Sequence, residues 1–375
     1  MPPSPEGHLT LRLYQSAGSQ VRVDVISSRP QLADRLFQNK TPDEAAELAG
    51  RVFTLCGRAQ RFAAAAACAA ARSSPLSPSS HSSLSSLSRK GNTPDWRSWQ
   101  QAVLVETALE HAWRLLIDWP AQAGLPPDMN TLRELRQAAI KGSQALADVL
   151  DTVRERTLLA GPAPPPYVPK KERNTISPNP ALLSKTAFPI LAGENGESGF
   201  LPPVSLLDPA EAGALAWHAL EEPAFCTRPI WRGQPVETGA LARQRHCPSL
   251  TDLLTESECR VQARWRARCI ELAELPARLR QEPNDLLLAQ SLAENHGYAW
   301  VETARGALLH AVRLEQGRVA AYRIIAPTEW NFHPAGPFAA GLATLGETSD
   351  LAAAAHALAL SLDPCVSYQV EVIDA

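Results

Sequence analysis

The 375-residue chain holds 36 Lys and Arg against 39 Asp and Glu, and this near balance, without a long basic block, argues against nucleic acid as a partner. The longest apolar run, 62–71, is about half of the ~20 residues that cross a bilayer, and no secretory signal pattern opens the chain. We therefore expect a cytoplasmic protein without a membrane partner, whose seven cysteines are reduced thiols rather than disulfides.

The N-terminal part of the chain predicts a β-hairpin followed by two helices. Apolar and polar residues alternate over 9–25 around a central turn, which is typical of a hairpin with one buried face. Thr41-Pro42-Asp43-Glu44 combines an N-cap, a first-turn proline and a capping-box glutamate, so a helix is expected over 42–50. After Cys56-Gly57 the alanine-rich stretch 63–71 predicts a second helix.

The middle of the chain predicts a helical hairpin between two irregular segments. Residues 73–93 are rich in serine and are interpreted as a disordered insertion, and 161–180 is interpreted as a proline-rich crossing. Between them, helical patterns over 95–119, capped by Thr93-Pro94, and over 130–159 predict an antiparallel helix pair.

The last part of the chain predicts helices and then strands. Helices are expected over 208–222 and 250–280, strands over 299–303, 307–315 and 318–326, and a final helix over 350–362. The sequence therefore predicts an α+β protein in one domain, 1–375, that is predominantly helical and has small antiparallel sheets near both ends.

Short motifs follow one another along the chain in an order typical of one family. They are Cys56-Gly57-Arg58-Ala59, the heptapeptide 237–243 (ETGALAR), the heptapeptide 302–308 (ETARGAL), the pentapeptide 327–331 (PTEWN) and Asp363-Pro364-Cys365. In this order they resemble Cys-x-x-Cys, EVGPLAR, EAPRGAL, P-[ST]-T-W-N and the start of DPCxxC in the large subunit of NiFe hydrogenases. The chain is most similar to the HupK/HoxV group of hydrogenase accessory proteins, which implies a large-subunit-like fold.

The departures from the family pattern are as informative as the matches. In the enzymes the second cysteine of each pair bridges nickel and iron, and Ala59 and Tyr368 stand at those positions. Ala63 stands near the place of a family histidine, and 370–375 contains no counterpart of the C-terminal histidine. The resemblance therefore implies a protein that is not an enzyme and binds no nickel.

The positions that remain are those that would hold iron with its diatomic ligands. The resemblance implies Cys56 and Cys365 as metal ligands, and Arg305 and Thr328 as groups that contact the cyanides of an Fe(CN)2(CO) unit. Because Cys56 precedes a helix, we expect its pKa to be lowered. Each residue also has a structural interpretation: a buried cysteine, a salt bridge for Arg305, a turn cap for Thr328, and for His310 a core histidine rather than a family ligand.

Several functions remain open. The first is a scaffold that receives the Fe(CN)2(CO) unit or a precursor from maturation proteins and passes it to the hydrogenase large-subunit precursor. The second is a metal-free adaptor that binds maturation chaperones of the HypC type or the immature hydrogenase. An active hydrogenase would need the missing bridging cysteines, and a zinc site would need a partner pair for His246-Cys247.

Overall fold

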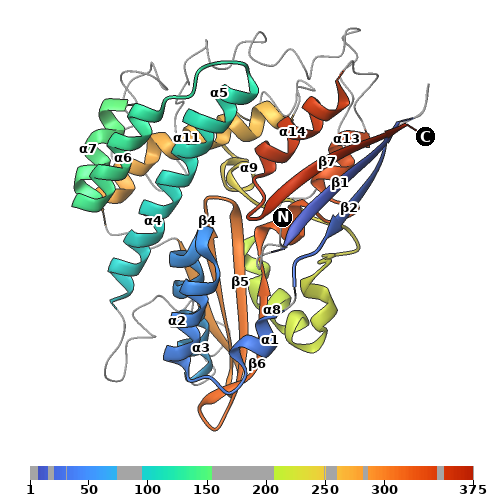
Figure 1. Ribbon diagram of the computed structural model, residues 1–375. Helices are drawn as coiled ribbons and strands as arrows, with labels where there is room; N and C mark the ends of the chain where they lie inside the picture. The colour runs from blue at the N-terminus through green and yellow to red at the C-terminus, as the bar shows by residue number, and fades with distance from the viewer. Residues whose placement is uncertain are drawn as a thin grey trace.

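The computed structural model describes residues 7–15, 21–30, 32–73, 95–153, 207–248, 250, 260–281, 286–343 and 350–374. The predicted serine-rich insertion from 74 onward, the proline-rich crossing and the Thr93-Pro94 cap lie outside the described residues. Within them, long helices and two small sheets confirm the predicted α+β class (Figure 1).

One sheet joins the two ends of the chain. It has the order β2-β1-β7, formed by β1 (His8–Gln15), β2 (Arg22–Ser27) and β7 (Ser367–Asp374). The predicted hairpin β1–β2 is confirmed, with Leu11 opposite Val25, but β7 runs parallel to β1, with Leu11 opposite Val370. The expectation of purely antiparallel sheets near both ends is therefore corrected, because the C-terminal strand adds to the N-terminal hairpin. Strand β7 was missed although its residues alternate in polarity.

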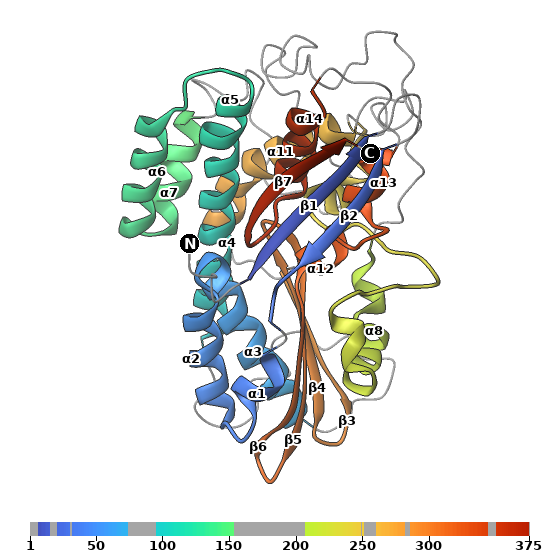
Figure 2. The ribbon, with the colours of Figure 1, turned by 45° about the vertical axis from the view of Figure 1, so that its right-hand side comes forward.

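The second sheet is an antiparallel meander with helices on both faces. Its order is β3 (Leu287–Ala293), β4 (His296–Thr303), β5 (Gly306–Glu315) and β6 (Arg318–Ile325), of which β3 was not predicted. Gln316 and Gly317 both have positive φ, as a tight hairpin turn between β5 and β6 requires. Figure 2 shows α2 (Pro42–Val52) and α3 (Gly57–Ala71) beside one face and α8 (Ala212–Glu221) beside the other.

Helix α3 lies unusually close to β4 because small residues meet at the contact. A Cβ atom added to Gly297 would lie 2.3 Å from the backbone N of Ala71 and 2.6 Å from the carbonyl O of Ala67. Neither backbone atom can move without displacing the helix. The alanines of α3 and Gly297 therefore set the distance between helix and sheet.

Gly297→Ala is expected to destabilise the protein by about 1–3 kcal/mol, since overpacking forces α3 away from β4. The matched control is Gly213→Ala in α8, where the added Cβ would meet its nearest atom, the hydroxyl of Tyr298, at 3.5 Å. Alanine favours a helix over glycine, so the control is expected to be neutral or stabilising. Thermal unfolding of both variants checks this, and equal melting temperatures would contradict it.

The helical half packs beside this sheet. Its long helices are α4 (Trp96–Trp113), α6 (Met129–Lys141), α7 (Ser143–Val153), α11 (Arg260–Arg280) and α14 (Leu351–Leu362), and α4 continues through a π-helical turn, Arg114–Asp118, into α5 (Trp119–Gln122). The single helix predicted over 130–159 is wrong: Gly142, at φ +121°, separates α6 from α7. Positive φ is incompatible with a right-handed helix, and glycine adopts it without steric cost.

Shorter elements lie between these in the described residues. They are α1 (Ala33–Phe37), the 3-10 turns Thr54–Cys56, Pro209–Glu211 and Pro223–Cys226, α9 (Ala240–Gln244), α12 (Pro327–Asn331) and α13 (Pro337–Ala343). None of the helices in the described ranges is long and apolar enough to cross a membrane.

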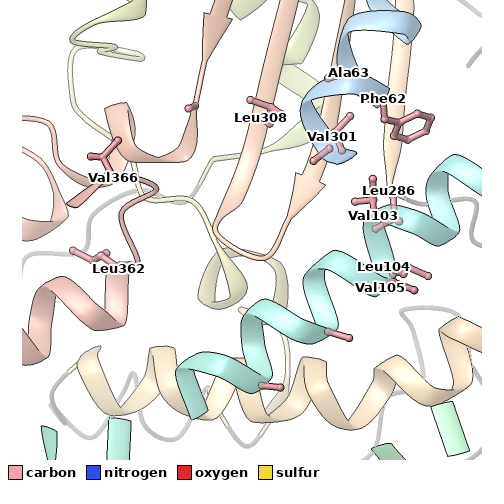
Figure 3. Close-up of a cluster of buried hydrophobic side chains, with 14 of the residues drawn as sticks. Phe62, Ala63, Val103, Leu104, Val105, Leu286, Val301, Leu308, Leu362 and Val366 are labelled. Atoms are coloured by element: carbon pink, nitrogen blue, oxygen red, sulfur yellow. The ribbon is translucent and has the colours of Figure 1, made fainter. Parts of the chain in front are cut away.

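A buried apolar cluster connects the two halves. Figure 3 shows Phe62 of α3, Val103 of α4, Leu308 of β5, Leu362 at the end of α14, and Val366 in the segment that follows that helix. This cluster holds the start of α3 and the end of α14 against the same core. The two segments that carry Cys56 and Cys365 are thus packed together although they are 309 residues apart.

Candidate functional site

Cys56 and Cys365 line the same pocket. Cys56 closes a 3-10 turn and occupies the N-cap position of α3, while Cys365 follows α14 after Asp363 and Pro364. The cavity that they help to line has a volume of about 100 Å³. Most of its other walls are apolar, and Arg29 and Glu329, 2.8 Å apart, form an ion pair at its edge.

The predicted lowering of the Cys56 pKa is wrong. Burial raises the pKa of this thiol to about 12, and the neighbouring Cys365 and Glu106 add to the shift. The first N–H groups of α3, those of Arg58 and Ala59, donate to the Glu106 carboxylate at 3.0 and 3.3 Å. These N–H groups are therefore paired with Glu106, and burial of Cys56 outweighs any stabilisation of a thiolate by the helix terminus.

Thr328 is bound to Cys365. Its hydroxyl donates to the Cys365 sulfur at 3.1 Å and accepts the backbone N–H of Cys365 at 3.0 Å. The alternative that Thr328 caps the Pro327 turn is wrong, because Ala326 is the N-cap of α12 and no side chain caps that helix. Thr328 thus fixes the conformation of Cys365, and its contact with a cyanide stays a prediction.

Arg305 lies between carboxylates and the two sulfurs. Its Nη2 atom is 2.7 Å from Glu110 and its Nε atom is 3.2 Å from Asp363, so the structural salt bridge is present. Burial opposes the charge, but Asp363 and Glu110 outweigh it and raise the pKa of Arg305 further; the sulfurs of Cys56 and Cys365 act in the same direction. The guanidinium therefore stays charged and is close enough to both thiols to attract their anionic forms.

Asp363 is the centre of a buried ion cluster that sequence analysis missed. Its carboxylate is 2.7 Å from Arg114 Nη2, 3.3 Å from Arg268 Nη1 and 3.2 Å from Arg305 Nε, and its side chain is fully buried. Burial alone would raise the pKa of Asp363, but these guanidinium groups outweigh it and hold the pKa well below its usual range. Asp363 itself adopts a left-handed φ of +57° at the end of α14, which directs the chain to Cys365.

His310 is a satisfied core histidine, as expected. Its ring nitrogens contact the Tyr322 hydroxyl at 2.7 Å and the Gln60 carboxamide at 2.9 Å, and burial lowers its pKa to about 3. Gln60 also lies 3.6 Å from the Cys56 sulfur. Sequence analysis did not identify Gln60, and the only signal for it was its position one helical turn after Cys56.

The other candidate ligands form no comparable site in the described part of the chain. Cys269 is buried in α11, and Cys259, its predicted neighbour on that helix, lies outside the described residues. Cys247 is partly buried and, among the residues that the structure describes, belongs to no group of three or more that could hold a metal ion. Within the described ranges, no group of at least three such residues has metal-binding geometry.

Known proteins are similar to this chain over almost its whole length. A protein of Rhizobium leguminosarum bv. viciae named hydrogenase expression/formation protein HupK is 30% identical over 366 residues, which cover 94% of this chain and 93% of that protein. The hydrogenase expression/formation protein HoxV of Cupriavidus necator is 30% identical over 392 residues, covering 98% and 96%. A family model described as nickel-dependent hydrogenase matches residues 268–366.

Solved structures show the same fold. The Ni-Fe-Se hydrogenase of D. vulgaris Hildenborough in its reduced state has a TM-score of 0.52 at 13% identity, over 93% of this chain and 94% of that chain. An NAD+-reducing NiFe hydrogenase has a TM-score of 0.50 at 15% identity, over 92% of both chains. The expected large-subunit-like architecture is therefore confirmed.

Proposed function

Because this chain belongs to the HupK/HoxV family of hydrogenase expression/formation proteins, we propose that it is a non-catalytic scaffold in the maturation of a NiFe hydrogenase. It transiently holds the Fe(CN)2(CO) unit or a precursor and passes it to the large-subunit precursor. Chaperones of the HypC type are the proposed upstream partners. The names of the relatives support the role in hydrogenase maturation, and the geometry of the pocket supports the iron cargo.

The observation that carries the proposal is the shared pocket of Cys56 and Cys365. Thiolates suit low-spin iron, and two of them would give a fragment with three diatomic ligands five ligands in all. The cavity of about 100 Å³ is of the same order as the ~150 Å³ cavity known to accept benzene. The size of the pocket that both sulfurs line is therefore compatible with a small iron fragment.

The residues at the positions of the two bridging cysteines support the same conclusion. Ala59 is buried and carries only a methyl group, and Tyr368 lies in β7 with its hydroxyl 3.5 Å from His356. Neither can bridge two metals as a thiolate does. The site therefore retains ligands for one metal and lacks those for a second.

The charges around the sulfurs favour an anionic cargo. Arg305 supplies a permanent positive charge next to both thiols, and cyanide nitrogens accept hydrogen bonds from such donors. Because burial keeps Cys56 protonated near neutral pH, iron must displace its proton on binding. Binding of the cargo therefore releases protons and weakens as the pH falls.

One observation favours the metal-free adaptor as a second candidate. Arg305 is already paired with Glu110 and Asp363, so its positive charge is balanced without an anionic ligand. In this alternative the large-subunit shape serves only to engage chaperones or the immature enzyme.

Metal analysis separates the two candidates. The protein is purified anaerobically from cells that express the maturation proteins, together with the Cys56→Ala/Cys365→Ala double variant. The scaffold predicts iron in proportion to protein, absent from the double variant. An iron-free protein that forms equally stable chaperone complexes with and without its cysteines would contradict the scaffold and support the adaptor.

A further inference from the structure

A chain of buried polar side chains ends on the Cys56 sulfur. Gln60 lies one turn after Cys56 on α3, His310 lies on β5 and Tyr322 on β6. Their exposed fractions are 1%, 0% and 0%. Burial of a polar side chain costs free energy unless the side chain has a hydrogen-bond partner. Here each of the three side chains contacts the next.

The distances connect the side chains in one line. The Tyr322 hydroxyl is 2.7 Å from His310 Nδ1, His310 Nε2 is 2.9 Å from Gln60 Oε1, and Gln60 Nε2 is 3.6 Å from Cys56 Sγ. The last distance is that of an N–H···S hydrogen bond. The line runs from the four-stranded sheet, through the start of α3, to the pocket.

The direction of the hydrogen bonds follows from the sulfur. A metal-bound thiolate carries no hydrogen and can only accept, so the Gln60 amide must present its N–H to Cys56 and its oxygen to His310. Oxygen accepts, so the proton of the neutral imidazole must lie on Nε2. Nδ1 is then free to accept from the Tyr322 hydroxyl.

Cys365 has a matching arrangement on the other side of the pocket. Its sulfur accepts one hydrogen bond, from the Thr328 hydroxyl at 3.1 Å. Each of the two sulfurs therefore receives one neutral donor from an element that the core holds rigid. Donors of this kind orient thiolate lone pairs and reduce the electron density that sulfur gives to a metal.

We propose that Gln60 is a positioning residue that donates a hydrogen bond to the Cys56 thiolate, and that His310 and Tyr322 fix the orientation of its amide. The inference rests on the proposed function, since it assigns a role in holding the same cargo. It predicts that the hydrogen-bond donor for the Cys56 thiolate is in place before a metal binds and displaces the proton of Cys56.

The test uses Cd2+ alone as the probe, because its thiolate charge-transfer absorption reports bonding to sulfur. Gln60→Met keeps the length of the side chain and removes the donor. We expect Cd2+ binding to weaken about tenfold or more. The absorption should move to longer wavelength, because the sulfur lone pairs are no longer stabilised by the N–H group.

The matched control is Gln100→Met, which replaces another glutamine with 1% exposure, on α4. It is expected to leave both the affinity and the wavelength unchanged. If Gln60→Met does not fold, Gln60→Asn takes its place, because an amide one methylene shorter cannot reach His310 and Cys56 together. Unchanged affinity and absorption in the folded Gln60 variant would overturn the proposal.

A measurement on the unaltered protein makes the test independent of any variant. The 15N NMR signals of His310 should show a proton on Nε2 in the Cd2+ complex, and a proton on Nδ1 would overturn the proposal. Cd2+ reports on the sulfurs whether or not iron is the natural cargo. Failure of the iron scaffold would appear in the metal analysis above, whereas failure of the Gln60 assignment would appear only with Cd2+.

Discussion

Asp363→Asn is expected to destabilise the protein by about 3–5 kcal/mol, the cost of removing one partner from a buried ion pair. The substitution keeps the shape of the side chain and removes the charge that Arg114, Arg268 and Arg305 share. Three guanidinium groups would then repel one another in a buried position. The midpoint of urea unfolding measures the loss.

The matched control for this variant is Asp148→Asn, whose carboxylate pairs with Arg280 at 2.7 Å on the surface. Solvent screens this pair, so a much smaller loss is expected. Equal shifts of the two unfolding midpoints would contradict the importance of the Asp363 cluster.

The same cluster sets a pH dependence. The pKa of Asp363 is lowered in the folded protein, so its stabilising contribution is complete above the unfolded pKa of about 3.9 and is lost as the pH falls through the lower folded value. The stability difference between the wild type and Asp363→Asn is therefore expected to be constant above about pH 5 and to shrink below about pH 4. A difference that grows on acidification would contradict this account.

Cys365→Ala is expected to lower hydrogenase activity in cells to the level found when this protein is deleted, while the protein itself stays folded. A single remaining thiolate gives the iron unit one protein ligand, and Thr328 loses the sulfur to which it donates. Cells that lack the wild-type protein and express the variant provide the measurement, with activity assayed on the hydrogenase.

Cys68→Ala is the matched control, because Cys68 lies on the same helix as Cys56 but is fully buried among alanines. It removes a thiol without touching the pocket. Full hydrogenase activity is expected with Cys68→Ala. Full activity with Cys365→Ala as well would show that the cysteine pair is not needed.

Local signals predicted the elements that depend on few residues. The capping box at Thr41 and Glu44 forms as expected, with Thr41 accepting from the Glu44 backbone and Glu44 accepting from the Thr41 backbone. The β5–β6 hairpin also follows its turn, Gln316-Gly317. Short-range hydrogen bonds and backbone preferences determine these structures, so a few neighbouring residues are enough to predict them.

Features that depend on distant residues could not be predicted in the same way. Arg114, in the π-helical turn after α4, and Arg268 of α11 meet Asp363, and no local pattern marks them as its partners. The Cys56 pKa was predicted with the wrong sign because burial dominates and because Glu106, 50 residues away, pairs with the helix terminus and adds to the upward shift. Of the residues that the family motifs indicated, Cys56 and Cys365 line the pocket, whereas their protonation depends on the packing around them.

The most direct test of the iron scaffold is infrared spectroscopy of the protein, purified anaerobically from cells with an active maturation pathway. The account predicts CN and CO stretching bands in the wild type and none in the Cys56→Ala/Cys365→Ala double variant. A wild-type protein without these bands, from cells that produce active hydrogenase, would contradict it.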